Sequence, residues 1–444
     1  MSPVSTERLF AEVVGAGRCS NPVVLFGTTV NLVTGELEPA TLRVACKDRR
    51  AVVCPSCSYL YKADAWILVS AGLMGGKGVD EEVRSHPTLF VTVTAPGFGS
   101  VHRQLSSGTC HMRPRHDHCV HGAPTQCAAR HADDDPALGT PICPMCFRYE
   151  DAVLWNATAS ALWHRTMIRL RQGIAASQRM PPRRLAKACR IHYLKVAELQ
   201  RRGLVHFHAV LRGDGPDGPG STPPEWLTTE LLSTTLEGLL RSIVVRGAGC
   251  TVRWGSQFVV AGMRGDPEDP AKIAAYVSKY AVKSTDGTNA MARRFLRRRQ
   301  IEHSPISPHA RRLALTAWDL GERPGLEHLR LRHHAHAFGF SGQLITKSQG
   351  YSTTFTALRV ARALHKASTA EDRDEVLGSF AFAGRGYSDP RGEALAEYLH
   401  QETVALRREA KERRVAEAKE SSKESRNDSR NHSRPTLDDE AEPQ

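Results

Sequence analysis

The sequence predicts an α+β protein, in which strands and helices come from separate stretches of one chain. Two stretches predict strands: Leu89–Thr94 alternates apolar and polar residues, and residues 191–212 read as two strands joined by a tight turn at Arg201–Gly203. One predicts a helix, because apolar residues recur at spacings of three and four between residues 151 and 172. With 444 residues, the chain is long enough for two or three domains.

The remaining elements follow from local signals. The strand at Leu89–Thr94 stops at Ala95-Pro96-Gly97, and Asp151 is a candidate cap for the helix that begins there. After the hairpin we expect, in chain order, a Gly/Pro loop at 214–224, a helix at 227–245, a short strand at 258–261, a helix from Pro270, and a charged helix from about Arg407 that gives way to disorder.

Composition divides the chain into four parts. They are an N-terminal zinc-binding region at 1–85, a central domain at 86–290 with a Cys/His-rich insertion at 102–147, a basic, α-rich C-terminal domain at 291–405, and a charged, largely disordered tail at 406–444. The insertion is poor in aliphatic residues, so we expect metal rather than a hydrophobic core to organise it.

The charge balance favours a polyanionic partner. Lys and Arg number 60 against 47 Asp and Glu, a formal charge of +13. Nucleic acid is the simplest such partner, although a merely basic soluble protein explains the charge about as well. No apolar run reaches the ~20 residues that span a bilayer. The N-terminus lacks the pattern of a signal peptide, so a cytoplasmic protein with reduced cysteines is expected.

The hairpin carries a candidate metal site. Residues two apart in a strand share a face, so His206 and His208 project together. Folding about the turn sets Glu198 opposite His206. Two imidazoles and a carboxylate suit a divalent cation. A His-Phe-His strand is more often structural when it stands alone.

The helix from Pro270 carries two tyrosines on one face. Tyr276 and Tyr280 are four residues apart, with Lys279 and Lys283 close by. A phenol ionises near pH 10, and a neighbouring ammonium favours the phenolate. These residues suit tyrosine attack on a phosphodiester. The alternative is a helix with two half-buried tyrosines and solvent-facing lysines.

The cysteines form two Cys-x-x-Cys pairs, Cys54/Cys57 and Cys143/Cys146, and each pair needs two further ligands for tetrahedral zinc. Cys19 and Cys46 are nearest to the first pair. The second has Cys119 and Cys127, with His116, His118, His121 and His131 as substitutes. Such zinc would be structural; reduced, unliganded thiols and a catalytic dithiol are the alternatives.

Taken together, these motifs resemble the HUH endonuclease superfamily, and within it the rolling-circle replication initiators of actinobacterial plasmids and integrative elements. Phe90–Thr94 is similar to its first motif, His206-Phe-His208 to its second, and Tyr276–Lys283 to its third. The cysteine pattern, Phe338–Gln343 and Thr346–Thr354 are also similar, and the likeness runs from about residue 15 to 365.

The resemblance implies a central antiparallel sheet with flanking helices, the metal hairpin at its centre and the tyrosine helix across it. It implies a nicking and joining domain at 86–290 that cuts single-stranded origin DNA through a 5′-phosphotyrosine. Mg or Mn would lie between His206, His208 and Glu198. Tyr280, which aligns through Lys279, would attack first, with Tyr276 as its partner.

The C-terminal domain is then a candidate for binding the origin duplex. The sequence has no Gly-x-x-x-x-Gly-Lys-Ser/Thr loop, which implies a host helicase as well as a host polymerase. Two other classes of function stay open: a transposase or relaxase that uses the same chemistry, and a zinc-dependent DNA-binding regulator without catalysis.

Overall fold

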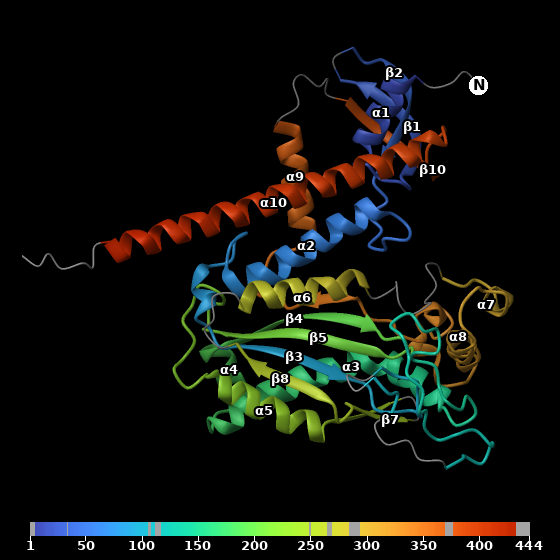
Figure 1. Cartoon of the computed structure of the whole chain (residues 1–444), viewed down its shortest axis with the longest axis vertical. Coiled ribbons are helices and arrows are strands. Elements are labelled where there is room, and N and C mark those ends of the chain that lie inside the picture. The colour runs from blue at the N-terminus through green and yellow to red at the C-terminus, as the bar shows by residue number, and fades with distance from the viewer. Residues whose placement is uncertain are drawn as a thin grey trace, which may run out of the picture. The chain divides into compact units, whose positions relative to one another are not determined.

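The computed structural model describes residues 5–32, 34–104, 108–111, 117–247, 250–263, 269–283, 294–368 and 376–431. His116 and the end of the tail lie outside these ranges, and the side chain of Lys283 is not described. The fold is mixed α+β with antiparallel sheets (Figure 1). It divides into two compact units: residues 1–48, 53–57 and 374–444 form one, and residues 49–52 and 58–373 form the other. The division at residues 85, 290 and 405 stays a prediction about function.

The first unit joins the two ends of the chain. Its three-stranded sheet has the order β10-β1-β2, with β1 (Val23–Asn31), β2 (Leu37–Val44) and β10 (Val376–Arg385) antiparallel throughout. Helix α1 (Thr6–Gly15), capped by the Ser5 side chain, packs against α10 (Arg391–Asn431). The charged helix expected from about Arg407 is confirmed as part of α10, and the disorder expected at the end of the tail stays a prediction. Pairs such as Arg408 with Glu412 suit a solvent-exposed helix.

The second unit is built on a five-stranded antiparallel sheet in the order β8-β3-β5-β4-β9. The predicted strands are confirmed as β3 (Thr88–Thr94), β4 (Arg190–Leu199), β5 (Val205–Asp214) and β8 (Phe258–Gly262). β9 (Ile345–Lys347), from the C-terminal part of the chain, adds an edge strand. The β4–β5 turn needs Gly203, whose φ of 76° lies in the left-handed region.

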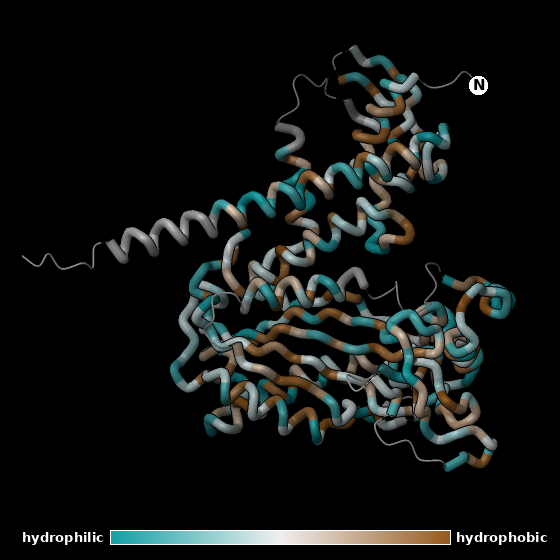
Figure 2. Tube along the Cα trace, viewed as in Figure 1, coloured by the Kyte–Doolittle hydropathy of each residue, from teal (hydrophilic) through white to brown (hydrophobic). Residues whose placement is uncertain are grey.

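Helices cover both faces of this sheet (Figure 1). On one face lie α3 (Tyr149–Ser177) and α5 (Thr229–Ser242), packed on inward residues such as Phe207 and Leu211. On the other lie α6 (Asp269–Lys283) and the part of α2 (Pro55–Met74) that belongs to this unit, packed on Leu194, Val196 and Val210. Figure 2 shows hydrophobic residues recurring along the strands between these helices.

The predicted helices are confirmed, with one correction. α3 begins at Tyr149, and its N-cap position is Arg148, so Asp151 does not cap the helix. Instead Asp151 accepts a hydrogen bond from Arg148 at 3.0 Å within the first turn. The remaining elements are η1 (Glu81–Arg84), α4 (Pro182–Ala188), β6 (Val244–Gly247), β7 (Cys250–Arg253), α7 (Arg298–Glu302), α8 (Pro308–Leu320), η2 (Glu327–Leu329), η3 (Ala335–Ala337) and α9 (Phe355–Ser368).

The insertion, which the sequence shows to be poor in aliphatic residues, has little regular secondary structure. In the insertion at 102–147, the described residues contain no regular helix or strand, only isolated bridges such as His118 with Pro124. No described helix combines the length and the apolar character that crossing a membrane requires.

Candidate active site and metal clusters

The strand register gathers the predicted metal ligands on one face of the five-stranded sheet. Glu198 of β4 lies directly opposite His206 of β5, as the tight turn predicted. Directly paired residues in an antiparallel sheet share a face. The rings of His206 and His208 are 4.6 Å apart, and Nε2 of His208 lies 3.4 Å from Oε2 of Glu198.

A threonine of the neighbouring strand fixes the orientation of His208. Thr92 of β3 is paired with His208, and its Oγ1 lies 3.1 Å from Nδ1 of the imidazole. When Nδ1 donates to this hydroxyl, Nε2 keeps its lone pair on the side of Glu198. Metal-binding histidines are usually oriented in this way by a second partner. No local sequence pattern predicts this role of Thr92, because the contact depends on the register of β3 against β5.

His206 has the properties of a metal ligand. Its side chain is half-buried, and its buried Nδ1 atom has no hydrogen-bond partner among the described residues. Burial, together with the charges of His208 and Arg202, lowers its pKa to about 3. The imidazole is therefore neutral at pH 7, which is the form that binds a metal. The three side chains are more widely spaced than the Cys-containing clusters described below, whose ligand atoms all lie within 4.8 Å of one another.

The tyrosines of α6 lie on the same face of the sheet as these histidines and contact His208. The ring of Tyr280 lies 4.1 Å from the ring of His208, and the ring of Tyr276 lies 5.4 Å from it. The two phenols are 4.7 Å apart, and Phe90 of β3 supports Tyr276 in an edge-on contact at 5.6 Å. Tyr276 is 43% exposed, whereas Tyr280 is half-buried. The helix thus brings both phenols to the candidate metal ligands.

The electrostatics of Tyr280 differ from the expectation based on neighbouring lysines. Burial raises the pKa of its phenol, and a hydrogen bond with Tyr276 and the charges of Tyr276 and Glu198 raise it further. Lys279 is exposed and is not among the causes of this shift. The described residues therefore hold Tyr280 in its protonated form, and ionisation needs a further positive charge.

A cavity of about 760 Å³ opens beside His206. Its polar lining includes Thr94 and Arg202, which are joined by a 2.9 Å hydrogen bond, together with Arg103 and Gln257. Sites for small ligands typically measure ~300–1,000 Å³. Two arginines and several neutral hydrogen-bonding groups suit a phosphate-bearing ligand.

The sequence matches a known family over most of its length. The model for the family described as "Replication initiator protein, pSAM2" (RepSA) matches residues 5–401. A protein of Streptomyces ambofaciens named "Replication initiator protein" is 38% identical over 409 residues, which cover 84% of this chain and 85% of that protein. The chain belongs to the RepSA family of replication initiators. No solved structure matches it.

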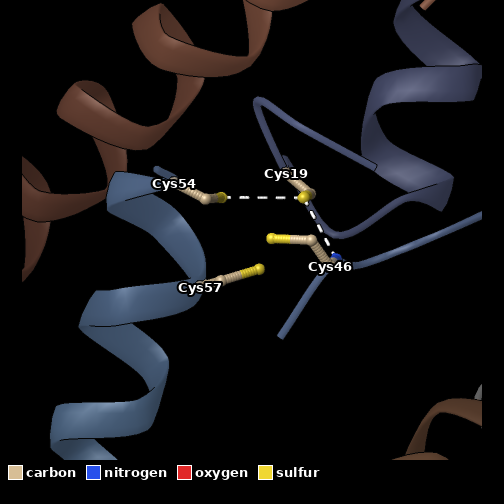
Figure 3. A group of neighbouring side chains, drawn as sticks. All are labelled: Cys19, Cys46, Cys54 and Cys57. Atoms are coloured by element: carbon tan, nitrogen blue, oxygen red, sulfur yellow. Dashed lines mark hydrogen bonds between the residues drawn. The ribbon is translucent and has the colours of Figure 1, made fainter. Parts of the chain in front are cut away.

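In this RepSA-family chain the first cysteine cluster forms as predicted. Cys19, Cys46, Cys54 and Cys57 converge within the first unit (Figure 3). Sγ of Cys19 and Sγ of Cys54 are 3.6 Å apart, close to the ~3.8 Å edge of a tetrahedron with Zn–S bonds of ~2.3 Å. Hydrogen bonds among the thiols, that with Cys19 foremost, raise the pKa of Cys57 and lower that of Cys54. This cluster could hold a metal such as zinc.

The second cluster differs from the predicted set by one ligand. Cys119, Cys143 and Cys146 surround His121, whose Nδ1 lies 4.0, 3.8 and 3.3 Å from their respective sulfurs. Cys127 was expected here and instead lies with His102, Cys110 and His131. His118 belongs to neither group. The insertion is irregular, so sequence distance was a poor guide to which ligand folds back onto the Cys143/Cys146 pair.

Proposed function

We propose that this replication initiator nicks and rejoins single-stranded DNA at a plasmid origin and so primes rolling-circle replication. The observation that carries the proposal is the approach of Tyr280 to His208, with ring centroids 4.1 Å apart, between α6 and β5. A nucleophile and a metal-ligand set on opposing elements can address the same phosphorus. The DNA strand would pass through the cavity beside His206.

In the proposed nicking step the phenolic oxygen of Tyr280 bonds to phosphorus and the bond from phosphorus to the 3′ oxygen breaks. The phenol loses its proton to solvent, and the departing 3′ oxygen takes one up. The products are a 5′-phosphotyrosine and a free 3′-hydroxyl that a polymerase can extend. Because the phosphotyrosine keeps the energy of the ester, a later 3′-hydroxyl can reverse the step and reseal a strand without ATP.

His206, His208 and Glu198 would hold Mg or Mn. The neutral His206 with its orphaned Nδ1, and the carboxylate beside His208, fit a divalent cation. When bound, such an ion supplies positive charge that polarises a phosphate and favours a phenolate. Thr92 keeps His208 in the orientation that serves the ion, and α6 keeps Tyr280 in place.

Tyr280 is proposed as the first nucleophile and Tyr276 as its partner. Tyr280 lies closer to His208 and is half-buried, which suits a residue held in one position. Tyr276 is more exposed and lies 4.7 Å from Tyr280 by ring centroid, near enough to accept a second strand at the same site. Lys279 and Lys283 of α6 stay proposed catalytic residues, whose positive charge would favour the phenolate. Host helicase and polymerase would act with the initiator on single-stranded and duplex origin DNA.

The proposal is tested by incubating the full chain with single-stranded oligonucleotides that tile its origin, with and without Mn or Mg. Intact mass should show a covalent adduct that requires the metal and disappears in Tyr280→Phe. A matched variant, Tyr398→Phe, changes an exposed tyrosine of α10 and should keep the adduct. A regulator without catalysis would bind the oligonucleotides and give no adduct under any condition.

A further inference from the structure

Beyond the two predicted clusters, the insertion gathers a third set of ligand atoms. His102, Cys110, Cys127 and His131 have their ligand atoms within 4.8 Å of one another. Nδ1 of His102 lies 3.2 Å from Nε2 of His131, and the same Nε2 lies 3.6 Å from Sγ of Cys127. Tetrahedral zinc with bonds of ~2.0–2.3 Å has edges of ~3.3–3.8 Å, so these separations fit one ion.

A carboxylate completes the arrangement behind His131. Oδ2 of Asp135 lies 2.7 Å from Nδ1 of His131, and Oδ1 accepts from the backbone N–H of Ala137 at 2.8 Å. A proton on Nδ1 leaves Nε2 with its lone pair, and Nε2 is the atom that faces His102 and Cys127. A carboxylate behind a metal-bound imidazole is the usual outer partner at zinc sites. Nδ1 of His102 and Nε2 of His131 face each other, and only one of them can donate a hydrogen bond to the other. A metal ion between them would accept the lone pair of both nitrogens.

The cluster is joined directly to the cavity beside His206. Arg103 follows the ligand His102 in the chain, and its backbone N–H lies 3.4 Å from Sγ of Cys110. Its side-chain Nε donates to the carbonyl oxygen of Cys110 at 3.1 Å. Arg103 also lines the cavity, as do His206 and Arg202. The position of this guanidinium therefore depends on the fold of the loop around Cys110.

A second connection runs to the turn between the candidate metal ligands. Arg201 donates to the carbonyl oxygen of Asp133 at 2.7 Å. Gly139, with a φ of 83°, packs so closely on Arg201 that a Cβ there would lie 2.6 Å from its backbone carbon. The insertion thus braces the β4–β5 turn, which sets Glu198 opposite His206.

We propose that His102, Cys110, Cys127 and His131 bind a structural zinc ion, and that this ion holds Arg103 at the cavity beside His206 to contact a phosphate of bound DNA. The zinc site stands on its own ligands, whereas the DNA contact rests on the function proposed above. With all four positions filled by protein, the ion has no open site for chemistry.

The metal site is tested by native mass spectrometry and elemental analysis of the full chain. Cys110→Ser and Cys127→Ser should each contain one zinc fewer than the unmodified protein. Cys189→Ser, which alters a buried thiol outside all three clusters, should keep the full number. Equal zinc content in Cys110→Ser and the unmodified chain would overturn the proposal.

A second variant guards against simple misfolding. Asp135→Asn keeps all four ligands and weakens only the partner of His131, so it should fold with zinc bound and release that zinc to a chelator at ~10–100-fold lower chelator concentration. Cobalt substitution should add the visible absorption of one tetrahedral site with two sulfurs, and Cys127→Ser should lose it. Unchanged release from Asp135→Asn and unchanged cobalt absorption in Cys127→Ser would both count against the site.

The DNA contact is tested by the salt dependence of oligonucleotide binding. Arg103→Gln should keep its zinc and lower the magnitude of the salt slope by ~0.7, the value for one phosphate contact on a single strand. Arg165→Gln, an exposed arginine of α3 on the other side of the sheet, should leave the slope unchanged. An unchanged slope in Arg103→Gln overturns the contact. An unmodified chain that forms no covalent adduct would overturn the nicking mechanism alone, because zinc content and salt slope do not depend on it.

Discussion

The ring of Tyr280 lies 4.1 Å from the ring of His208, although the two residues come from a helix and a strand far apart in the chain. The hairpin sets His208 on the same face as Glu198, and α6 packs on that face through Ala274 and Val277. The phenol of Tyr280, the imidazole of His208 and the carboxylate of Glu198 therefore lie close together on one face of the sheet. This arrangement leads to predictions that separate the roles of the individual residues.

Thr92→Val should weaken metal binding without unfolding the protein. The change keeps the shape of the side chain and removes the hydroxyl that lies 3.1 Å from Nδ1 of His208. We expect Mn affinity, measured by calorimetry, to fall ~10–100-fold, the range seen when an outer partner of a metal ligand is lost. Thr316→Val, which removes an exposed hydroxyl of α8, is the control. Equal Mn affinity in Thr92→Val and the unmodified chain would refute the orienting role.

Tyr276→Phe should keep the first covalent capture and shift its pH dependence. The hydrogen bond with Tyr276 and the charge of Tyr276 both raise the pKa of Tyr280, so removing that hydroxyl should lower this pKa. The phenolate is the attacking form, and the rise of the capture rate with pH should therefore move to lower pH. A shift to higher pH, or loss of all capture, would contradict the assignment of Tyr280 as first nucleophile.

Lys195→Met should stabilise the second unit near neutral pH. Lys195 is 3% exposed, lies 3.8 Å from the centre of the Phe207 ring, and burial lowers its pKa to about 8. The unfolded side chain has a pKa of ~10.4. Between these two pKa values only the unfolded chain binds the proton, so the stability of the unmodified protein rises with pH across this window. Below the window Lys195 is charged in the folded state as well, and the full cost of burying that charge is present.

The penalty on Lys195 is at most ~3 kcal/mol, since each pKa unit corresponds to ~1.4 kcal/mol, and its contact with the Phe207 ring offsets part of it. Thermal unfolding at pH 7 should therefore show a Tm a few degrees higher in Lys195→Met, and the gain should shrink by pH 10. Lys62→Met, which changes an exposed lysine of α2, should leave the Tm unaltered at both values. A gain in Tm of Lys195→Met that grows from pH 7 to pH 10 would contradict a cost that comes from burying the charged lysine.

Cys57→Ser should unfold the first unit while leaving the sheet of the second unit intact. Apart from the cluster, the first unit has a small core of residues such as Leu9 and Val13. Structural zinc contributes directly to the folding of such small regions. Hydrogen exchange should show lost protection in β1 and β2 with unchanged protection in β5. Chelation of the unmodified chain should reproduce this pattern, and protected strands after complete zinc loss would argue against the cluster as a folding element.

Local signals predicted the parts of this fold that depend on neighbouring residues. Gly203 and the alternating strands around it determine the hairpin, and its register follows, so Glu198 meets His206 as expected. The pairing of β1 with β10 joins residues near opposite ends of the chain, and no local pattern encodes such a contact. The charged helix expected from about Arg407 is part of α10, which begins earlier, at Arg391, because charged residues at spacings of four support a long helix.

The cysteine and histidine clusters also show that local sequence patterns do not predict contacts between distant residues. Two Cys-x-x-Cys spacings located two clusters, because those pairs lie on single turns. Cys127 was expected beside Cys143 and Cys146 but lies with His102, Cys110 and His131, and neither His102 nor Cys110 was predicted to join a cluster. Their positions depend on the path of an irregular insertion. Thr92 escaped notice because its contact with His208 follows from strand pairing across more than a hundred residues.

The most direct measurement is the identity of the residue that carries the DNA. The covalent adduct formed with an origin oligonucleotide and Mn is digested, and the modified peptide is sequenced by mass spectrometry. We expect a nucleotide attached to the oxygen of Tyr280, in a metal-dependent adduct that Glu198→Gln also abolishes. Attachment to a residue outside α6, or an adduct that forms equally well without metal, would contradict it.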